Sequence, residues 1–235
     1  MVFWLGTAMI AHAYAEVLER IAHAAARVGR SPSDIRVVAA VKGQGIAAIR
    51  EALDAGIRLI GHNYVQEAIK ETPVELPPET ELHLIGHLQR NKVGKAATFF
   101  HMIQTIDNPE IAEFLEVKAK ALGRTLDVLI QVSLAGEPQK AGIAPERVEA
   151  LALKIRSLLH LRLRGLMTMP PFFDDPEAAR PYFTQLRELR DRLIASDVLP
   201  AEATELSMGM TGDFEVAIEE GATLVRIGTA IFGPR

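Results

Sequence analysis

Short apolar runs alternate with longer amphipathic segments along most of this chain. The runs that we interpret as strands are residues 35–41, 58–61, 82–86, 100–106, 127–134, 163–169, 205–208 and 223–227. Most are continuously apolar, which is typical of parallel strands whose outer face is covered by helices. Eight strands alternating with helices predict a single (β/α)8 TIM barrel in the α/β class. A doubly wound open sheet is the alternative.

The segments between these runs have helical periodicity and helix-ending residues. The predicted helices cover residues 9–28, 46–55, 64–71, 109–122, 145–159, 176–195 and 214–220. Asn108 is a suitable N-cap for the fourth of them, and Gly123 follows its end. The segment 9–28 precedes the first strand, so we expect an extra N-terminal helix. No linker or low-complexity tract interrupts the pattern, and we expect one domain over residues 1–235.

Composition narrows the possible functions. A net charge of −4, with dispersed Lys and Arg, gives no electrostatic footprint for nucleic acid. The absence of cysteine excludes disulfides, thiolate metal sites and cysteine nucleophiles. The apolar segment 1–10 has no preceding basic residue and is short, so we interpret it as leading into the first helix rather than as a signal peptide. We expect no membrane span and a cytoplasmic protein.

Active sites of such barrels lie at the carboxyl ends of the strands. The polar or otherwise notable residues predicted to lie there are Lys42, His62, Asn63, His87, Gln89, Asn91, Met167, Ser207 and 226–229. A lysine that ends a buried strand loses part of its hydration, which favours the neutral amine needed for a Schiff base. The structural alternative is a lysine that extends to solvent.

The end of the chain carries a candidate anion-binding loop. Phosphate often binds in these barrels at the loops after strands seven and eight. Ser207, Gly228 and Thr229 fall in those loops and offer hydroxyl and backbone N–H donors, although a tight glycine turn explains the loop equally well. Arg226 lies on the same strand face as Gly228, where it could meet an unprotonated pyridine nitrogen or form a structural ion pair. A lysine beside such a loop favours pyridoxal 5'-phosphate as cofactor.

Metal and serine chemistry fit the sequence less well. His62, His83 and His87 lie near strands two and three, but no H-x-H or H-E-x-x-H spacing occurs. A metal-dependent hydrolase remains a minor alternative with Asp107 and Asp213 as carboxylates. Ser207 lacks the preceding Gly-x of a nucleophile elbow.

Five segments resemble one known family. They are GHNYVQE at 61–67, HLIGHLQRNK at 83–92, LRGLMTM at 163–169, LSMGMTGDF at 206–214 and VRIGTAIFG at 225–233. These motifs resemble those of the pyridoxal phosphate homeostasis proteins, the single-domain relatives of the alanine racemase barrel. The resemblance implies Lys42 as the Schiff-base lysine and Arg226 as the partner of the pyridine nitrogen. It further implies that Ser207, Gly228 and Thr229 hold the phosphate, that Asn63 and Met167 line the cofactor, and that His87 lies near it.

The sequence departs from the family pattern beside Lys42 and before Asn63. Val41 and Gly43 flank Lys42, where the family has Ser and Thr, so a hydroxyl beside the lysine is lost. His62 replaces the usual Glu before Asn63 and introduces a titratable base near the expected rim. We expect cofactor affinity or its pH dependence to differ accordingly.

The choice between carrier and enzyme depends on a second base. By resemblance, alanine racemases take that base, a tyrosine, from a further C-terminal domain of the partner subunit, whereas this sequence ends at Arg235 directly after the eighth strand. None of Tyr14, Tyr64 and Tyr182 falls at a predicted strand end. An arginine also leaves the pyridine nitrogen unprotonated, which makes the ring a poor electron sink. We therefore predict a monomeric, non-catalytic protein for cofactor storage, delivery or regulation that serves apo forms of pyridoxal phosphate enzymes, with a racemase-like enzyme as the alternative.

Overall fold

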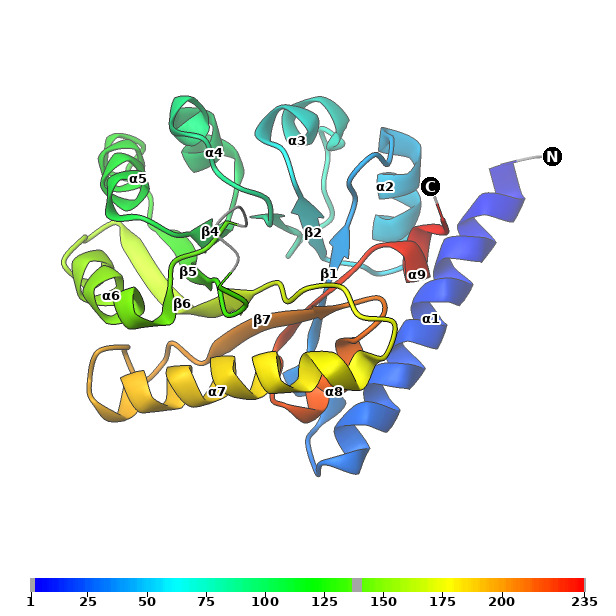
Figure 1. Cartoon of the computed structure of the whole chain (residues 1–235). Helices are drawn as coiled ribbons and strands as arrows, with labels where there is room; N and C mark the ends of the chain where they lie inside the picture. Colours follow the sequence, from blue (N-terminus) through cyan, green and yellow to red (C-terminus); the bar gives the residue numbers. More distant parts are fainter. Residues whose placement is uncertain (1–2, 137–140, 235) are drawn as a thin grey trace.

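Eight parallel strands close into a barrel in chain order in the computed structural model of this protein, which describes residues 3–136 and 141–234 (Figure 1). The strands are β1 (Arg36–Ala40), β2 (Leu59–His62), β3 (Glu81–Leu84), β4 (Met102–Ile106), β5 (Leu126–Val132), β6 (Leu161–Thr168), β7 (Glu205–Met210) and β8 (Leu224–Ile227). Pairing of β1 with β8, which joins Ala39 to Ile227, closes the barrel. This closure confirms the TIM barrel over the open sheet. The expected domain 1–235 also includes 1–2, 137–140 and 235, which lie outside the described residues.

Helices cover the outside of the barrel. They are α1 (Phe3–Arg27), α2 (Ile46–Asp54), α3 (Val65–Glu71), α4 (Val93–Phe99), α5 (Pro109–Ala121), α6 (Val148–Arg156), α7 (Arg180–Ala195), α8 (Phe214–Glu219) and α9 (Thr229–Phe232). Helices α4 and α9 were not predicted, because they are short and lack a side-chain N-cap. Two predicted helices begin later than expected because Pro145 and Pro176 open 3-10 turns instead.

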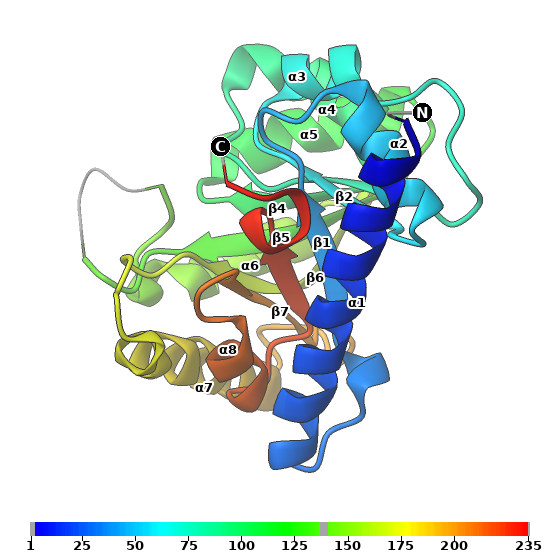
Figure 2. The ribbon, with the colours of Figure 1, turned by 90° about the vertical axis from the view of Figure 1, so that its right-hand side faces the viewer.

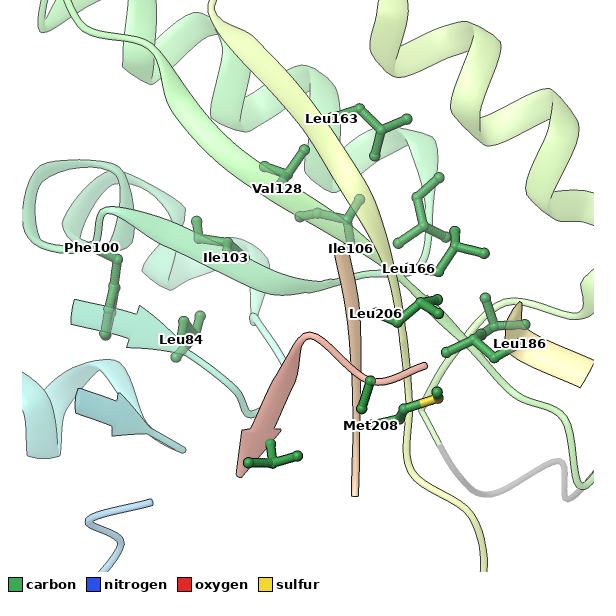
Figure 3. Packing of buried hydrophobic residues seen from close by; sticks show 14 of the residues in the cluster. Leu84, Phe100, Ile103, Ile106, Val128, Leu163, Leu166, Leu186, Leu206 and Met208 are labelled. Atoms are coloured by element: carbon green, nitrogen blue, oxygen red, sulfur yellow. The ribbon is translucent and has the colours of Figure 1, made fainter. Parts of the chain in front are cut away.

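Strand alternation divides the buried side chains into two layers. Val37, Ala39 and Val41 face outward into the large core between strands and helices, part of which Figure 3 shows around β4 to β7. The inner layer fills the barrel itself. Its apolar members are Val38, Leu59, Ile85, Met102, Leu129, Met167 and Leu224, with Ala40 packed against them. This inner layer lies beneath the carboxyl ends of the strands, where the site is expected.

The N-terminal helix α1 packs along the outside of the barrel, beside α2, α8 and α9 (Figures 1 and 2). Arg20 on α1 makes two hydrogen bonds to Glu215 of α8, at 2.8 and 2.9 Å. Its guanidinium carbon also lies 4.5 Å from the centroid of the Phe214 ring. Helix α1 therefore braces the side of the barrel at which the first and last strands meet.

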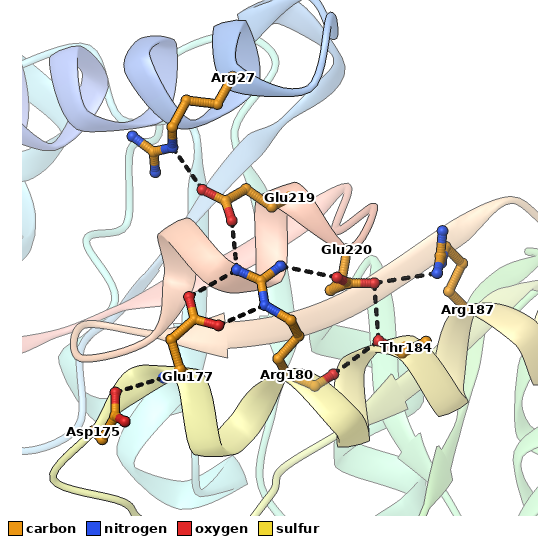
Figure 4. A network of polar contacts seen from close by, with 8 residues as sticks. All are labelled: Arg27, Asp175, Glu177, Arg180, Thr184, Arg187, Glu219 and Glu220. Carbon is orange, nitrogen blue, oxygen red and sulfur yellow. Dashed lines mark hydrogen bonds and ion pairs between the residues drawn. The ribbon is translucent and has the colours of Figure 1, made fainter.

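A charged network ties the start of α7 to α8 and α1 (Figure 4). Arg180 donates to Glu177, Glu219 and Glu220, and Arg27 of α1 pairs with Glu219 at 2.6 Å. The hydrogen bond from Arg180 is the main cause that lowers the pKa of Glu219. Because the loop before α7 forms one wall of the cavity described next, this network also holds that wall in place.

Candidate functional site

A cavity of about 530 Å³ opens at the carboxyl ends of the strands. Five of the predicted site residues line it, namely Lys42, Asn63, Arg226, Gly228 and Thr229. The remaining lining residues are Ala40, Ile85, Met169, Phe172, Phe173, Pro176, Ala179, Met210, Thr211, Gly212 and Asp213. The rim that the sequence pattern predicted therefore does contain a pocket, and residues from the first and last strands meet in it.

Lys42 is the second residue after β1 and is half-buried in this cavity. The turn after it is fixed by the backbone N–H of Gly43, which donates to the Glu67 carboxylate of α3 at 2.5 Å. Gly43 has a φ of 72°, a conformation that a side chain in that position would strain. The Lys42 Nζ lies 5.8 Å from the centroid of the Tyr64 ring. The loop thus presents Lys42 to the cavity.

Hydroxyl and amide groups gather at the Gly228 end of the cavity. Gly228 lies beside β1, and a Cβ there would come within 3.4 Å of the Ala40 carbonyl oxygen. Thr229 begins α9, and the Thr211 Oγ1 lies 3.4 Å from the backbone nitrogen of Ala230. Thr211 was not among the predicted site residues, although its place in the LSMGMTGDF motif was the available signal. These groups are the donors that an anion requires.

Arg226 also lines the cavity and is only 3% exposed. Its Nη1 donates to the Ser207 hydroxyl at 2.7 Å and its Nη2 to the Thr168 carbonyl at 2.8 Å. Burial lowers the pKa of Arg226 to about 10, with the charge of Asp213 opposing the shift. The guanidinium is therefore cationic at neutral pH, and N–H groups remain for an acceptor in the cavity because a guanidinium carries five.

Three other predicted residues do not line this cavity. Ser207 is fully buried below Arg226, and its hydroxyl donates to Gln104. Met167 is fully buried in the apolar interior of the barrel. His87 lines a neighbouring cavity of about 340 Å³, which shares Asn63, Ile85 and Met169 with the first. Its Nδ1 lies 3.7 Å from the Asp107 carboxylate.

His62 lies on the outer face of β2 rather than at the cavity. Its Nε2 is 3.0 Å from the Thr72 hydroxyl, and its ring packs edge-on against Phe100. Burial lowers the pKa of His62 to about 4, so the imidazole is neutral at neutral pH. His62, which stands where the family pattern has Glu, therefore acts on packing between the strands and helices.

Asp213 belongs to the cavity, although the sequence indicated it only as a carboxylate of the metal-dependent alternative. Two aromatic residues of the cavity were not predicted. Asp213 accepts a hydrogen bond from the Met210 backbone at 2.6 Å, and burial raises its pKa while Arg226 opposes that shift. Phe172 and Phe173 come from the loop before α7 and form an apolar wall. Phe173 stacks on Tyr182 with ring centroids 5.8 Å apart.

The three histidines raised as metal ligands lie in separate environments. His62 packs outside the barrel, His83 contacts Glu81 and Gln104 inside it, and His87 faces the neighbouring cavity. Within residues 3–136 and 141–234, no three His, Asp or Glu side chains gather as metal ligands would. Over the same residues, no helix has the length and apolar character of a membrane span.

Comparison with known proteins shows the family to which this chain belongs. The family described as alanine racemase, N-terminal domain, matches residues 15–235. The pyridoxal phosphate homeostasis protein of Aquifex aeolicus is 42% identical over 221 residues, which cover 93% of this chain and 95% of that protein. The corresponding protein of Pseudomonas aeruginosa is 41% identical and covers 96% of each. The chain belongs to the pyridoxal phosphate homeostasis protein family.

Solved structures agree with this assignment. PipY of Synechococcus elongatus, solved with pyridoxal phosphate bound, is 36% identical with a TM-score of 0.80, covering 91% of this chain and all of that one. An alanine racemase of Clostridium difficile has a TM-score of 0.71 at 16% identity, over 93% of this chain and 56% of the racemase. The racemase is therefore similar in fold alone.

Proposed function

We propose that this protein binds pyridoxal 5'-phosphate as a Schiff base on Lys42 and serves its storage, delivery or regulation, with little or no catalysis. One observation carries the proposal. A lysine amine, an arginine guanidinium and a group of hydroxyl and amide donors line a single cavity of about 530 Å³. Homologues at about 42% identity bear the name of this cofactor's homeostasis, and a relative of the same fold has been solved with it bound.

The donor set fits the three polar ends of the cofactor. When bound, the cofactor supplies an electrophilic aldehyde, which is the group that a lysine amine captures. Thr211, Gly228 and Thr229 offer the hydroxyl and N–H donors that suit a phosphate. Arg226 offers N–H donors to an unprotonated ring nitrogen, while Phe172 and Phe173 supply an apolar wall for the ring. Each partner comes from this chain alone.

Lys42 performs the covalent step in this proposal. The Lys42 amine would attack the aldehyde carbon, a C=N bond would replace the C=O bond, and the oxygen would leave as water. Arg226 then limits further chemistry, because a guanidinium that donates to the ring nitrogen gives it no proton and leaves the ring a weak electron sink. That property supports a carrier.

Tyr64 gives the enzymatic alternative its specific support. Its ring lies closer to the lysine than the sequence suggested, with the centroid 5.8 Å from Lys42 Nζ. Tyr64 is nevertheless 55% exposed and lines the neighbouring cavity rather than that of Lys42. A tyrosine so placed could serve a weak racemase as a base.

Proton exchange separates carrier from enzyme. Protein loaded with pyridoxal 5'-phosphate is mixed with L- or D-alanine in deuterated water, and the α-proton signal is followed by NMR. We expect exchange no faster than with the free cofactor, and the same rate in Tyr64→Phe. Rapid exchange in the unaltered chain that disappears in Tyr64→Phe would establish the racemase-like enzyme instead.

The proposal includes a cytoplasmic monomer that passes its cofactor to apo forms of pyridoxal phosphate enzymes. A Schiff base is reversible by hydrolysis, so the cofactor can leave Lys42 without a further reagent. Mixing the loaded protein with an apo enzyme should restore that enzyme's activity faster than dilution into free buffer releases the cofactor. Light scattering of the loaded protein reports the mass of the species that transfers it.

A further inference from the structure

A line of buried polar side chains crosses the interior of the barrel below the cavity. It runs from Arg226 on β8 through Ser207 on β7 and Gln104 on β4 to His83 and Glu81 on β3. Ser207, Gln104 and His83 are each 0% exposed, among interior side chains that are otherwise mostly apolar. Buried polar groups are costly unless each has a partner, so a complete line of this kind calls for an explanation.

The hydrogen bonds along the line have one consistent direction. A guanidinium can only donate, so the Ser207 oxygen accepts from Arg226 at 2.7 Å. The Ser207 hydroxyl then donates to the Gln104 Oε1 at 2.6 Å. The Gln104 amide is oriented by that bond, and its Nε2 donates to the Nδ1 of His83 at 2.9 Å.

The same direction fixes the state of His83. Its Nδ1 accepts from Gln104, and its Nε2 donates to the Glu81 carboxylate at 3.0 Å. That bond is the main cause that lowers the pKa of Glu81, as expected for an ionised acceptor. Each donor in the line, from Arg226 to His83, donates toward the amino-terminal mouth of the barrel, where Glu81 begins β3.

Arg226 is the one member of this line that lines the cavity. Its Nη1 is held by Ser207 and its Nη2 by the Thr168 carbonyl. The planar guanidinium therefore has a fixed orientation, and its remaining N–H groups have fixed directions. Without the Ser207 and Gln104 contacts, the guanidinium would retain its charge but lose that orientation.

We propose that Ser207, Gln104 and His83 are positioning residues that act through Arg226 and make the cavity selective for a ring with an acceptor nitrogen. This inference rests on the proposed function, since the selected ring is that of pyridoxal 5'-phosphate. It also gives Ser207 a different task from phosphate binding. The charge of Arg226 draws an anionic ligand in any orientation, whereas its held N–H groups distinguish a ring nitrogen from a ring carbon.

The test compares two ligands that differ at that one atom. Dissociation constants are measured by absorbance titration for pyridoxal 5'-phosphate and for its analogue in which C–H replaces the ring nitrogen. We expect the unaltered chain to prefer the natural cofactor by about tenfold or more, the range for one hydrogen bond to a charged group. Ser207→Ala and Gln104→Leu should bring that preference close to unity, mainly by weakening the natural cofactor.

Gln131→Leu is the matched control. Gln131 is also a buried glutamine on a barrel strand, but its amide donates to the Ala141 carbonyl outside the line. We expect it to retain the preference for the natural cofactor. Ser207→Thr, which keeps a hydroxyl, should retain most of it as well.

The outcomes are distinguishable. Equal weakening of both ligands in Ser207→Ala, or an unchanged ratio, would contradict a role through Arg226 and indicate structural support only. If the unaltered chain does not prefer the natural cofactor about tenfold over the analogue, the inference is also overturned, although cofactor binding still stands. Failure of the unaltered chain to bind either ligand would instead refute the proposed function. If Gln104→Leu does not fold, the smaller change Ser207→Ala decides alone.

Discussion

Thr211 and Thr229 line the cavity and carry hydroxyl groups. We expect Thr211→Ala and Thr229→Ala each to weaken binding of pyridoxal 5'-phosphate by about 1–3 kcal/mol, because each removes one hydrogen bond to a charged phosphate. Titration of the apo protein measures the effect. Thr98→Ala is the control, since that hydroxyl bonds to Gly94 on α4 away from the cavity. Unchanged affinity in both cavity variants would mean that the phosphate binds elsewhere.

His62 predicts a pH dependence of stability that is independent of the cofactor. Burial lowers the pKa of His62 to about 4, whereas an unfolded histidine titrates near 6.5. As pH falls, the unfolded chain takes up the proton first. The contribution of His62 to the free energy of unfolding is therefore full above about pH 6.5 and is lost as pH falls toward about 4.

From pH 7 to pH 5 this loss amounts to about 2 kcal/mol. His62→Gln keeps a partner for Thr72 but does not titrate. Between pH 7 and pH 5, its free energy of unfolding should therefore fall by about 2 kcal/mol less than that of the unaltered chain. Urea unfolding at the two pH values measures the difference, with the exposed His12→Gln as control. An identical decline in His62→Gln and the unaltered chain would show that His62 is protonated freely in the folded state.

At the scale of elements, the approach of β6 to β7 depends on Gly165. Its φ is 149°, and a Cβ there would lie 2.0 Å from the backbone carbonyl oxygen of Glu205. We expect Gly165→Ala to lower the free energy of unfolding by about 3 kcal/mol or more, because a strand backbone must move. Gly123→Ala, at a φ of 63° with open space around it, should cost about 1 kcal/mol. Similar losses in both variants would contradict the close approach.

The order of elements was predictable, but the height of a residue within the barrel was not. Apolar runs and helix-ending residues predicted eight strands, and the family motifs predicted the rim. The prediction ended strand seven at Met208, which put Ser207 at the rim. The strand in fact continues to Met210 through a register shift, with Gly209 at a φ of 88°. Because of this extension, Ser207 lies below the rim inside the barrel, and Thr211 lines the cavity.

Contacts across the barrel could not be predicted from spacing either. Gln104 and Ser207 lie on strands that do not pair with each other, and they meet only because the sheet closes. His62 was expected near the rim because it directly precedes Asn63 in the chain. Strand alternation sends the two side chains to opposite sides, so Asn63 lines the cavity while His62 packs outward. In both cases the missing information was three-dimensional.

For the whole molecule, barrel closure is what joins the two halves of the site. Pairing of β1 with β8 brings the loop after Val41 beside the loop after Ile227. Helix α1 and the Arg180 network then hold the outside of this region. The central claim is that Lys42, presented by this closure, is the residue that captures the cofactor.

Borohydride reduction of the protein loaded with pyridoxal 5'-phosphate, followed by peptide mass mapping, tests that claim most directly. Reduction makes the Schiff base permanent, so we expect the added mass on the peptide that contains Lys42. Lys42→Ala should carry no label after reduction, while still binding the cofactor noncovalently through Arg226 and the phosphate loop. Label on a different residue of the unaltered chain, such as Lys92 of the neighbouring cavity, or no label at all, would contradict the claim.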